Sequence, residues 1–174
     1  RAGRVPEQAE IDKALAQVGF DHVDLDASQR TVRFASPIVR INFNSIGKGY
    51  ALDRAADLLV ERGVDTFRLH GGRSSVLARG NQFAGDETGW RVGLRHPLRG
   101  DEQMAEFTLC DEALATSGAA TQWFEYRGKR YGHILDPRTG WPAEGVYTAT
   151  AIAPSAAEAD ALSTACYVMG PDEV

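Results

Sequence analysis

The chain contains short segments in which apolar and polar residues alternate, separated by glycine-rich or polar turns. This pattern constrains the fold of the 174-residue chain more than any other feature. Such alternation is typical of half-buried β-strands, and short turns between strands favour antiparallel pairing. The pattern therefore predicts an α+β fold, with mainly antiparallel sheets and packed helices. The expected strands cover residues 22–25, 31–34, 38–43, 66–69, 75–78, 90–94, 105–109, 113–116, 124–126, 131–135 and 146–153.

Helical periodicity is confined to three stretches. It predicts helices over residues 6–18, from 51 to near 63, and over 155–169. The last helix opens with a capping box made by Ser155 and Glu158. Its expected buried face consists of Ala161, Leu162, Ala165, Cys166 and Met169.

Composition places the chain among globular proteins, since 43% of its residues are hydrophobic and 25% are charged. We expect one domain over residues 1–174, because folding at this size buries about 70% of the unfolded chain's surface. No apolar run approaches the roughly 20 residues of a membrane span, and we expect no signal peptide within the given residues, because no positively charged start is followed by an apolar segment. The net charge of −5, with dispersed Lys and Arg, argues against nucleic-acid binding.

Two cysteines, Cys110 and Cys166, lie far apart in the sequence without a CxxC spacing or a nearby histidine. Zinc binding and thioredoxin-type chemistry therefore have little support. Burial as two small apolar side chains and pairing in a disulfide both stay open.

Residues 44–50 form a small polar loop between an expected strand and the start of a helix. The free amides and the positive dipole end of such a helix suit phosphate, and Lys48 would add a point charge. The loop is not a Walker A motif, because Asn42 stands at the place of the first glycine and Gly49 at that of the Ser/Thr. A plain strand-to-helix turn is the alternative.

A pair of glycines, Gly71 and Gly72, stands before Arg73. This pair supports either a phosphate contact or only a tight turn.

Residues 115–118 and 133–140 bring polar groups to the ends of expected strands. His133 is expected to lead a strand that turns at Asp136, so that its imidazole could move a proton or hold a phosphate. A structural role for the histidine is equally open. A serine-hydrolase pairing of Ser117 with His133 is weak, because no GxSxG motif surrounds the serine.

Asp160 and Thr164 stand four residues apart and share one face of the last helix. A carboxylate and a hydroxyl can bind one hard cation, which would need substrate phosphates and waters to complete its shell. Position alone also allows simpler roles, with Thr164 bonded to its own helix backbone and Asp160 favoured by the helix dipole.

Taken in order, the segments INFNSIGKGYALDRAADLL, LHGGRSSVLARG, ATSG, HILDPRTG and EADALSTACYVMG resemble the FAD:protein FMN transferase (ApbE) family over residues 38–170. The resemblance implies an α+β fold that binds FAD and Mg²⁺. It also implies cleavage of FAD and transfer of FMN, through a phosphoester, to Thr or Ser of a partner flavoprotein. Hydrolysis of FAD to FMN and AMP is the other family activity.

The resemblance also assigns residue roles. Asp160, Thr164 and the backbone carbonyl of Gly47 fall on the metal ligands, and His133 and Asp160 on the catalytic positions. The residues expected to contact flavin nucleotide are Lys48, Asp53, Ser117, His133 and Thr139.

Departures from the family pattern leave two rival hypotheses. Asn44 and Ser45 replace glycines of the family loop, and the terminal strands that contact flavin in full-length members are missing, so the domain is expected to be incomplete at both ends. A catalytically silent FAD-binding module and a non-flavin scaffold or interaction domain are the alternatives. Since members are often extracytoplasmic bacterial lipoproteins, we expect a periplasmic or membrane-anchored location, with a cytoplasmic one still open.

Overall fold

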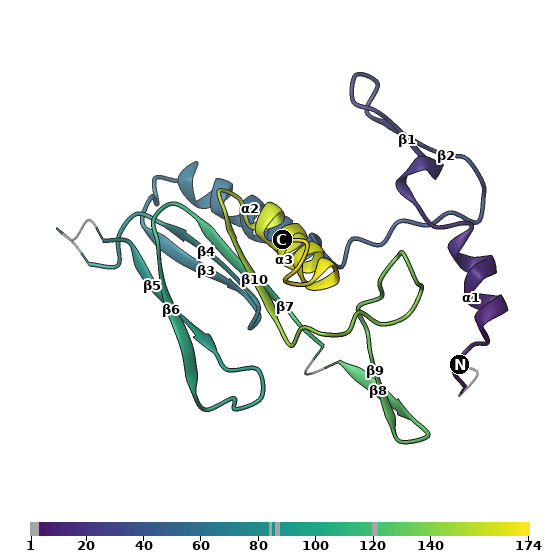
Figure 1. Ribbon diagram of the computed structural model, residues 1–174. Coiled ribbons are helices and arrows are strands. Elements are labelled where there is room, and N and C mark those ends of the chain that lie inside the picture. Colours follow the sequence, from purple (N-terminus) through teal and green to yellow (C-terminus); the bar gives the residue numbers. More distant parts are fainter. Residues whose placement is uncertain (1–3, 84, 86–87, 120–121) are drawn as a thin grey trace. The chain divides into compact units, whose positions relative to one another are not determined.

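The computed structural model describes residues 4–83, 85, 88–119 and 122–174, which fall into two compact units (Figure 1). Unit 1 combines residues 1–42 with 122–143, and unit 2 combines residues 43–121 with 144–174. The expected α+β fold of antiparallel sheets and helices is confirmed. The assignment of one domain to residues 1–174 stays a prediction.

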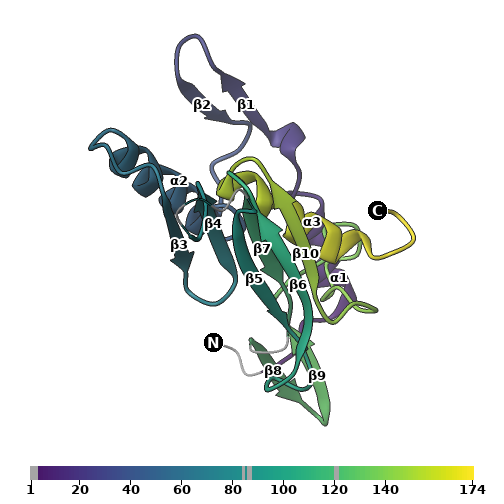
Figure 2. The same cartoon turned by 90° about the vertical axis from the view of Figure 1, so that its left-hand side faces the viewer.

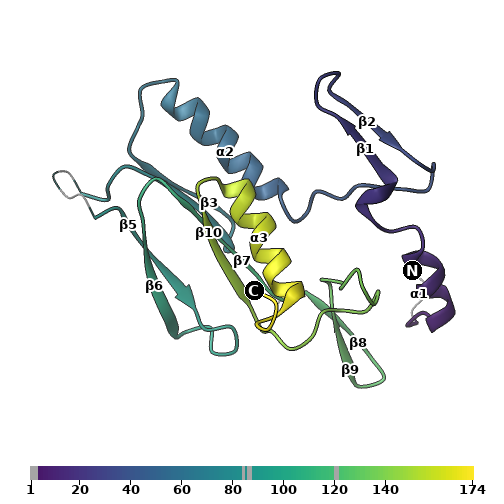
Figure 3. The same ribbon diagram turned by 45° about the horizontal axis from the view of Figure 1, so that its top comes forward.

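Unit 2 is built in three layers around a four-stranded antiparallel sheet with the strand order β10-β7-β4-β3. Helices α2 and α3 lie on one face of this sheet (Figure 3). The hairpin β5–β6 lies on the other face, in front of β4 and β7 in Figure 2. The bounds are α2 Gly47–Val60, β3 Phe67–Gly71, β4 Ser75–Arg79, β5 Trp90–Arg95, β6 Gln103–Leu109, β7 Ala113–Ser117, β10 Ala149–Ala153 and α3 Ala156–Met169.

The residues of strand β4 are buried on both faces of the sheet. Leu77 belongs to the cluster under the helices, whereas its neighbours Val76 and Ala78 belong to the cluster under the β5–β6 hairpin. Because successive side chains of a strand point to opposite faces, a strand buried on both sides reads as a continuous apolar run. Leu77 is fully buried, which stabilises the fold by roughly 1.5–3 kcal/mol.

Unit 1 holds smaller elements: helix α1 and two separate hairpins. Phe124 and Tyr131 stack across the second hairpin with ring centroids 5.1 Å apart, and Arg130 lies over the ring of Trp123 at 4.1 Å. The bounds are α1 Gln8–Leu15, the 3₁₀ turn η1 Phe20–His22, β1 Val23–Asp26, β2 Thr31–Phe34, β8 Trp123–Tyr126 and β9 Lys129–Gly132.

Three strand predictions were wrong in extent. Residues 38–43 form no strand, because no neighbouring strand pairs with them and their apolar side chains, such as Ile38 and Phe43, stay exposed. Strand β9 ends at Gly132, where its partner β8 begins at Trp123, so His133 follows the strand instead of leading one. Strand β10 begins only at Ala149, where its pairing with Ser117 starts.

The predicted buried face of the last helix was also wrong. Leu162 and Met169 are exposed, whereas Ala159, Asp160 and Ser163 are buried. The small side chains let α3 lie close to α2 and the sheet, and the buried polar groups are acceptable because they have hydrogen-bond partners.

Two further predictions concern the state of the cysteines and a membrane span. Cys110 is exposed and Cys166 half-buried, and both are free, so the disulfide does not form. The prediction that both cysteines are buried was therefore wrong for Cys110. Among the described residues, no helix combines the length and apolar character that crossing a membrane requires.

Candidate functional site

The site begins at the first turn of α2. The expected loop over residues 44–50 is shorter than predicted, because the helix already starts at Gly47, whose N–H donates to the carbonyl of Phe43 at 2.7 Å. No side chain of the preceding residue, Ile46, caps this helix end. The Gly47 N–H is thus already bonded, whereas the N–H of Gly49 and the positive end of the helix dipole face the group that lies beside this turn.

The carboxylate of Asp160 occupies that place. Its side chain is only 4% exposed, and Oδ2 accepts the N–H of Gly49 at 2.7 Å. Oδ1 accepts the hydroxyl of Ser75 at 2.6 Å and the ammonium of Lys48 at 3.3 Å. A buried carboxylate is costly unless it is paired and hydrogen-bonded, and these donors meet both conditions.

Lys48 connects this buried group to the solvent. Its Nζ also donates to the hydroxyl of Ser75 at 3.1 Å, so Lys48, Ser75 and Asp160 bond to one another in a closed set. The lysine side chain is 48% exposed, in contrast to the carboxylate. The ammonium is thus held at the boundary between the protein and water, where an anionic ligand could reach it.

A cluster of hydroxyl groups lies beside Asp160 on the same side of the sheet. Thr164 and Ser163 both donate to the backbone carbonyl of Asp160, at 3.2 and 3.0 Å. The hydroxyl of Ser117 at the end of β7 lies 2.9 Å from that of Thr164 and 3.0 Å from that of Ser163. The simpler role that position alone allowed, a bond from Thr164 to its own helix, is therefore present.

Strand order explains why these groups meet. Ser75 starts β4 and Ser117 ends the antiparallel β7, with Ser75 opposite Ala115 in the register. Both serines therefore come to the same end of the sheet, and the alternation of side chains puts them on the face covered by the helices.

The oxygen atoms of this site fit a hard cation in their chemistry. The structure carries a carboxylate, the Thr164 hydroxyl and the backbone carbonyl of Gly47 as oxygen donors on α2 and α3. A carboxylate offers about four lone-pair sites, of which the contacts described above use three. Among the described residues no three His, Cys, Asp or Glu side chains gather around one point, so an ion here would depend on water and substrate oxygens as well.

Asp53 lies where α2 meets the start of α3. Its Oδ1 and Oδ2 accept the N–H groups of Ala156 at 2.8 Å and Ala157 at 2.9 Å, so it caps the first turn of α3. Ser155 caps the same helix by accepting the N–H of Glu158 at 3.2 Å, as the predicted capping box requires of the serine. The flavin contact of Asp53 stays a prediction.

His133 and Thr139 belong to unit 1. The Nδ1 atom of His133 lies 3.0 Å from the carbonyl oxygen of Gln122. Since a carbonyl only accepts, Nδ1 carries the hydrogen, and in the neutral ring Nε2 is left as an acceptor. The hydroxyl of Thr139 accepts the N–H of Trp141 at 3.2 Å and thereby holds its own loop.

The loop that follows His133 is closed by an ion pair. Arg138 binds Asp136 through its side chain, with Nη2 2.8 Å from Oδ2, and also donates its backbone N–H. The hydrogen bonds and charge of this guanidinium lower the pKa of the Asp136 carboxyl. The carboxylate, guanidinium and hydroxyl that the sequence placed in one loop therefore interact mainly with that loop.

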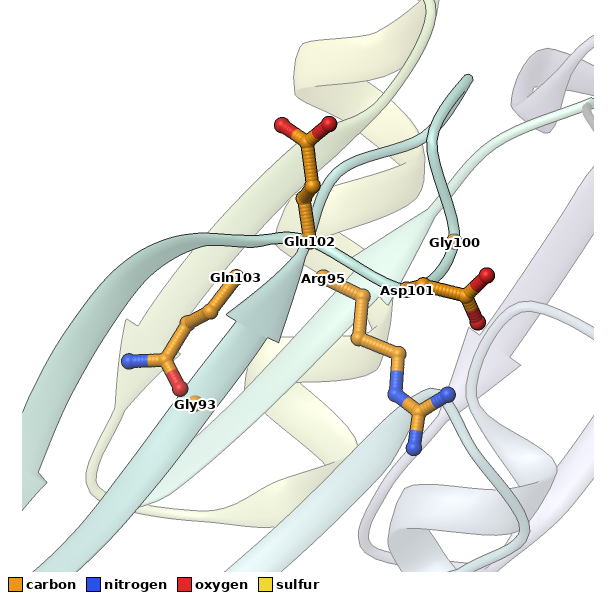
Figure 4. A pocket seen from close by; sticks show the side chains of 6 residues that line it. All are labelled: Gly93, Arg95, Gly100, Asp101, Glu102 and Gln103. Atoms are coloured by element: carbon orange, nitrogen blue, oxygen red, sulfur yellow. The ribbon is translucent and has the colours of Figure 1, made fainter.

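A pocket of unit 2 lies apart from these predicted residues. It opens at the turn of the β5–β6 hairpin. There the side chain of Gln103 extends over Gly93, and the side chain of Arg95 lies on the side of the turn where Asp101 is found (Figure 4). None of the residues predicted for metal, flavin or catalysis lines it. We therefore locate the candidate site at Asp160 and not in this pocket.

Sequence reasoning missed the role of Ser75 and Ser163, two of the buried polar residues of unit 2. A signal was available for Ser75, because the alternation of β4 places it in the same buried row as Leu77. No comparable signal marked Ser163, whose partner on β7 is distant in sequence.

The fold and this site define an α+β protein in which a buried carboxylate on one helix is bonded to a half-exposed lysine and to the N-terminal turn of a second helix. The family model described as the ApbE family matches residues 1–174, and the chain belongs to that family. The resemblance stated from the motifs is thus confirmed.

Individual relatives agree with this assignment. The FAD:protein FMN transferase of Escherichia coli K12 is 31% identical over 176 residues, which cover 98% of this chain and 49% of the relative. The crystal structure of the ApbE protein of Thermotoga maritima matches with a TM-score of 0.85 and 40% identity, over 95% of this chain and 52% of the other. The apo form of the flavinyl transferase ApbE of Pseudomonas stutzeri matches with a TM-score of 0.79 and 33% identity, over 98% and 51%. The chain spans about half the length of these proteins.

Proposed function

We propose that this chain carries flavin transferase chemistry: cleavage of FAD and attachment of FMN, through a phosphoester, to a Thr or Ser hydroxyl of a partner flavoprotein. Hydrolysis of FAD to FMN and AMP is the same reaction with water as acceptor. The observation that carries the proposal is the buried Asp160 carboxylate tied to Lys48, Ser75 and Gly49, in a chain whose relatives are named FAD:protein FMN transferases.

The proposed reaction breaks one phosphoanhydride bond of FAD and forms one phosphoester bond. The acceptor oxygen attacks the phosphorus that bears riboflavin, AMP leaves with the bridging oxygen, and the acceptor hydroxyl loses its proton. Negative charge grows on the bridging and terminal oxygens, so positive groups already in place lower the barrier.

Lys48 and the first turn of α2 supply such positive groups. The ammonium is fixed by Ser75 and Asp160 while half of its side chain is exposed, so it can bind a diphosphate oxygen without large reorganisation. The first-turn amides add their dipole. Asp160 balances the positive charge when no substrate is present.

Mg²⁺ would be held by Asp160, Thr164 and the carbonyl of Gly47 in this proposal. When bound, such an ion neutralises charge on phosphate oxygens and favours their displacement. Its support here is the oxygen-donor set of the site together with the family resemblance.

His133 is the proposed proton acceptor or phosphate-orienting group. Its hydrogen bond to the carbonyl of Gln122 fixes the hydrogen on Nδ1 and leaves Nε2 to accept a proton from a hydroxyl. Flavin contacts of Lys48, Asp53, Ser117 and Thr139, and an extracytoplasmic location, belong to the same proposal by family resemblance.

The direct test incubates the 174-residue chain with FAD and Mg²⁺ and follows FMN and AMP by chromatography. We expect both products in equal amounts, and their loss by at least about 100-fold in Asp160→Ala, because the variant removes a charged group from the site. Asp160→Asn keeps an acceptor for the Gly49 amide and covers the case in which Asp160→Ala fails to fold. Asp57→Ala is the matched control, since Asp57 is an exposed carboxylate of α2 paired only with Arg54 among the contacts described.

Other outcomes identify the rival functions. FAD binding without FMN or AMP would indicate a silent flavin module, and no spectral or thermal response to FAD would indicate a scaffold. Equal product from the wild-type chain and the folded Asp160 variants would remove Asp160 from the reaction. Covalent flavin on an added flavoprotein domain, seen by in-gel fluorescence, distinguishes transfer from hydrolysis.

A further inference from the structure

Helices α2 and α3 cap each other through two carboxylates. Asp53 of α2 accepts the N–H groups of Ala156 and Ala157 in the first turn of α3. In return, Asp160 of α3 accepts the N–H of Gly49 in the first turn of α2. Each carboxylate satisfies backbone donors that a helix end leaves without intrahelical partners.

We infer that Asp53 is a positioning residue for the site: through this exchange of caps it holds α3 so that Asp160 meets Lys48, Ser75 and Gly49. The cap contacts themselves do not depend on the activity. The inference rests on the proposed function only where it calls the positioned groups reactive.

The path from Asp53 to the site is short and consists of backbone. Asp53 binds the N–H groups of Ala156 and Ala157. Asp160 lies one helical turn further along α3. At the same crossing the backbone of Gly49 lies so close to Ala156 that a Cβ on residue 49 would overlap the Ala156 carbonyl. A shift of the start of α3 on α2 would therefore move Asp160 relative to Gly49 and Lys48.

Asp53 has no described role of its own at the charged cluster. Its two oxygens are bonded to α3, whereas Lys48 is bonded to Ser75 and Asp160. Apart from the flavin contact that the family resemblance assigns to it, Asp53 should therefore affect the cluster only through the placement of α3.

Ser155 provides the matched control. It caps the same helix end, but its bond goes to Glu158 within α3 and does not tie α3 to α2. Loss of Ser155 should weaken the helix without releasing Asp160, whereas loss of Asp53 should do both. The comparison separates a positioning role from general stabilisation of α3.

The first experiment measures native-state amide hydrogen exchange in the 174-residue chain. The exchange rate of the Gly49 amide should rise about fivefold or more in Asp53→Ala, the size expected from loss of a helix cap. It should change less than about twofold in Ser155→Ala. The amide of Leu77 in the central strand reports global opening, and the Gly49 effect should exceed any change there.

Asp53→Asn keeps one oxygen acceptor and serves if Asp53→Ala does not fold. It should give an effect between those of the wild type and Asp53→Ala. Gly49 exchange that rises no more in the folded Asp53 variants than in Ser155→Ala would overturn the inference, whatever the activity of the chain.

The second experiment follows kcat and KM for FAD in the same variants. We expect kcat to fall about tenfold in Asp53→Ala at equal folded protein, with a smaller effect in Ser155→Ala, because misplacement of reacting groups lowers the rate of the chemical step. An unchanged kcat beside a released Gly49 amide would overturn the positioning role. If the wild-type chain produces no FMN, the proposed function fails, and the exchange experiment still decides whether Asp53 places Asp160.

Discussion

The backbone of Gly49 lies against the carbonyl of Ala156 and leaves no room for a side chain between helices α2 and α3. The two helices therefore touch at their first turns, close to the Asp160 cap on the Gly49 amide. Close approach of two backbones is a reason for glycine inside a helix, where it otherwise costs stability relative to alanine.

Gly49→Ala should destabilise unit 2 by about 3 kcal/mol or more, since the new Cβ meets backbone atoms that cannot rotate away. Equilibrium urea unfolding measures this loss. Gly47→Ala, two residues earlier in the same turn, is the control, because a Cβ there would meet only the Cβ of Phe43 at 4.0 Å. We expect Gly47→Ala to be neutral or slightly stabilising. Similar losses in both variants would show that the close contact is not what residue 49 requires.

Ser75→Ala should weaken both the fold and the proposed reaction. It removes the 2.6 Å hydrogen bond to Asp160 Oδ1 and leaves the buried carboxylate with fewer donors, at a cost of about 1–3 kcal/mol. Ser163→Ala is the matched variant, because Ser163 is equally buried but donates to the backbone carbonyl of Asp160. Urea unfolding and FMN formation are measured together. A larger loss of FMN formation in Ser163→Ala than in Ser75→Ala would contradict the role of the carboxylate contact.

The sequence predicted most elements of the sheet because their side-chain alternation is local information. It failed for residues 38–43, since alternation creates a strand only where a partner strand is available. It also failed for the buried face of α3, where periodicity favoured Leu162 and Met169 over Asp160 and Ser163. Burial of those polar residues depends on donors and acceptors that come from β4, β7 and α2, which periodicity along one helix does not contain.

The charged residues of the candidate site were predicted from the sequence, whereas Ser75, Ser163 and the contacts among these groups were not. Motif resemblance pointed to Lys48 and Asp160, and the structure joins them at 3.3 Å. The same resemblance assigned a flavin contact to Asp53, which stays a prediction, and gave no indication that its carboxylate caps α3. A motif marks which residues matter in a family without distinguishing groups that touch a ligand from groups that hold the framework.

His70 on strand β3 predicts a dependence of stability on pH. Although the His70 side chain is exposed, desolvation by the residues around it, and then the charge of Arg68, lower its pKa below the ordinary value of about 6.5. The unfolded chain therefore binds the proton more readily, so the stability present above about pH 6.5 is lost as the pH falls toward the folded-state pKa. Unfolding free energies at pH 7.5 and 5.5 should differ less in His70→Gln than in the wild type. An NMR midpoint of His70 at or above the ordinary value would contradict the prediction.

Gly140→Ala should destabilise unit 1 more than Gly128→Ala. Both glycines have a positive φ, +72° and +77°, so alanine is strained at either position by roughly 1–2 kcal/mol. At residue 140 the new Cβ would also overlap the side chain of Ile11, against which the 136–141 loop packs, whereas at residue 128 it meets open space. We expect an additional loss of about 1–3 kcal/mol for Gly140→Ala from this overlap, measured by urea unfolding with tryptophan fluorescence. Because the two substitutions share the backbone strain, equal losses would mean that packing on α1 does not stabilise the loop after His133.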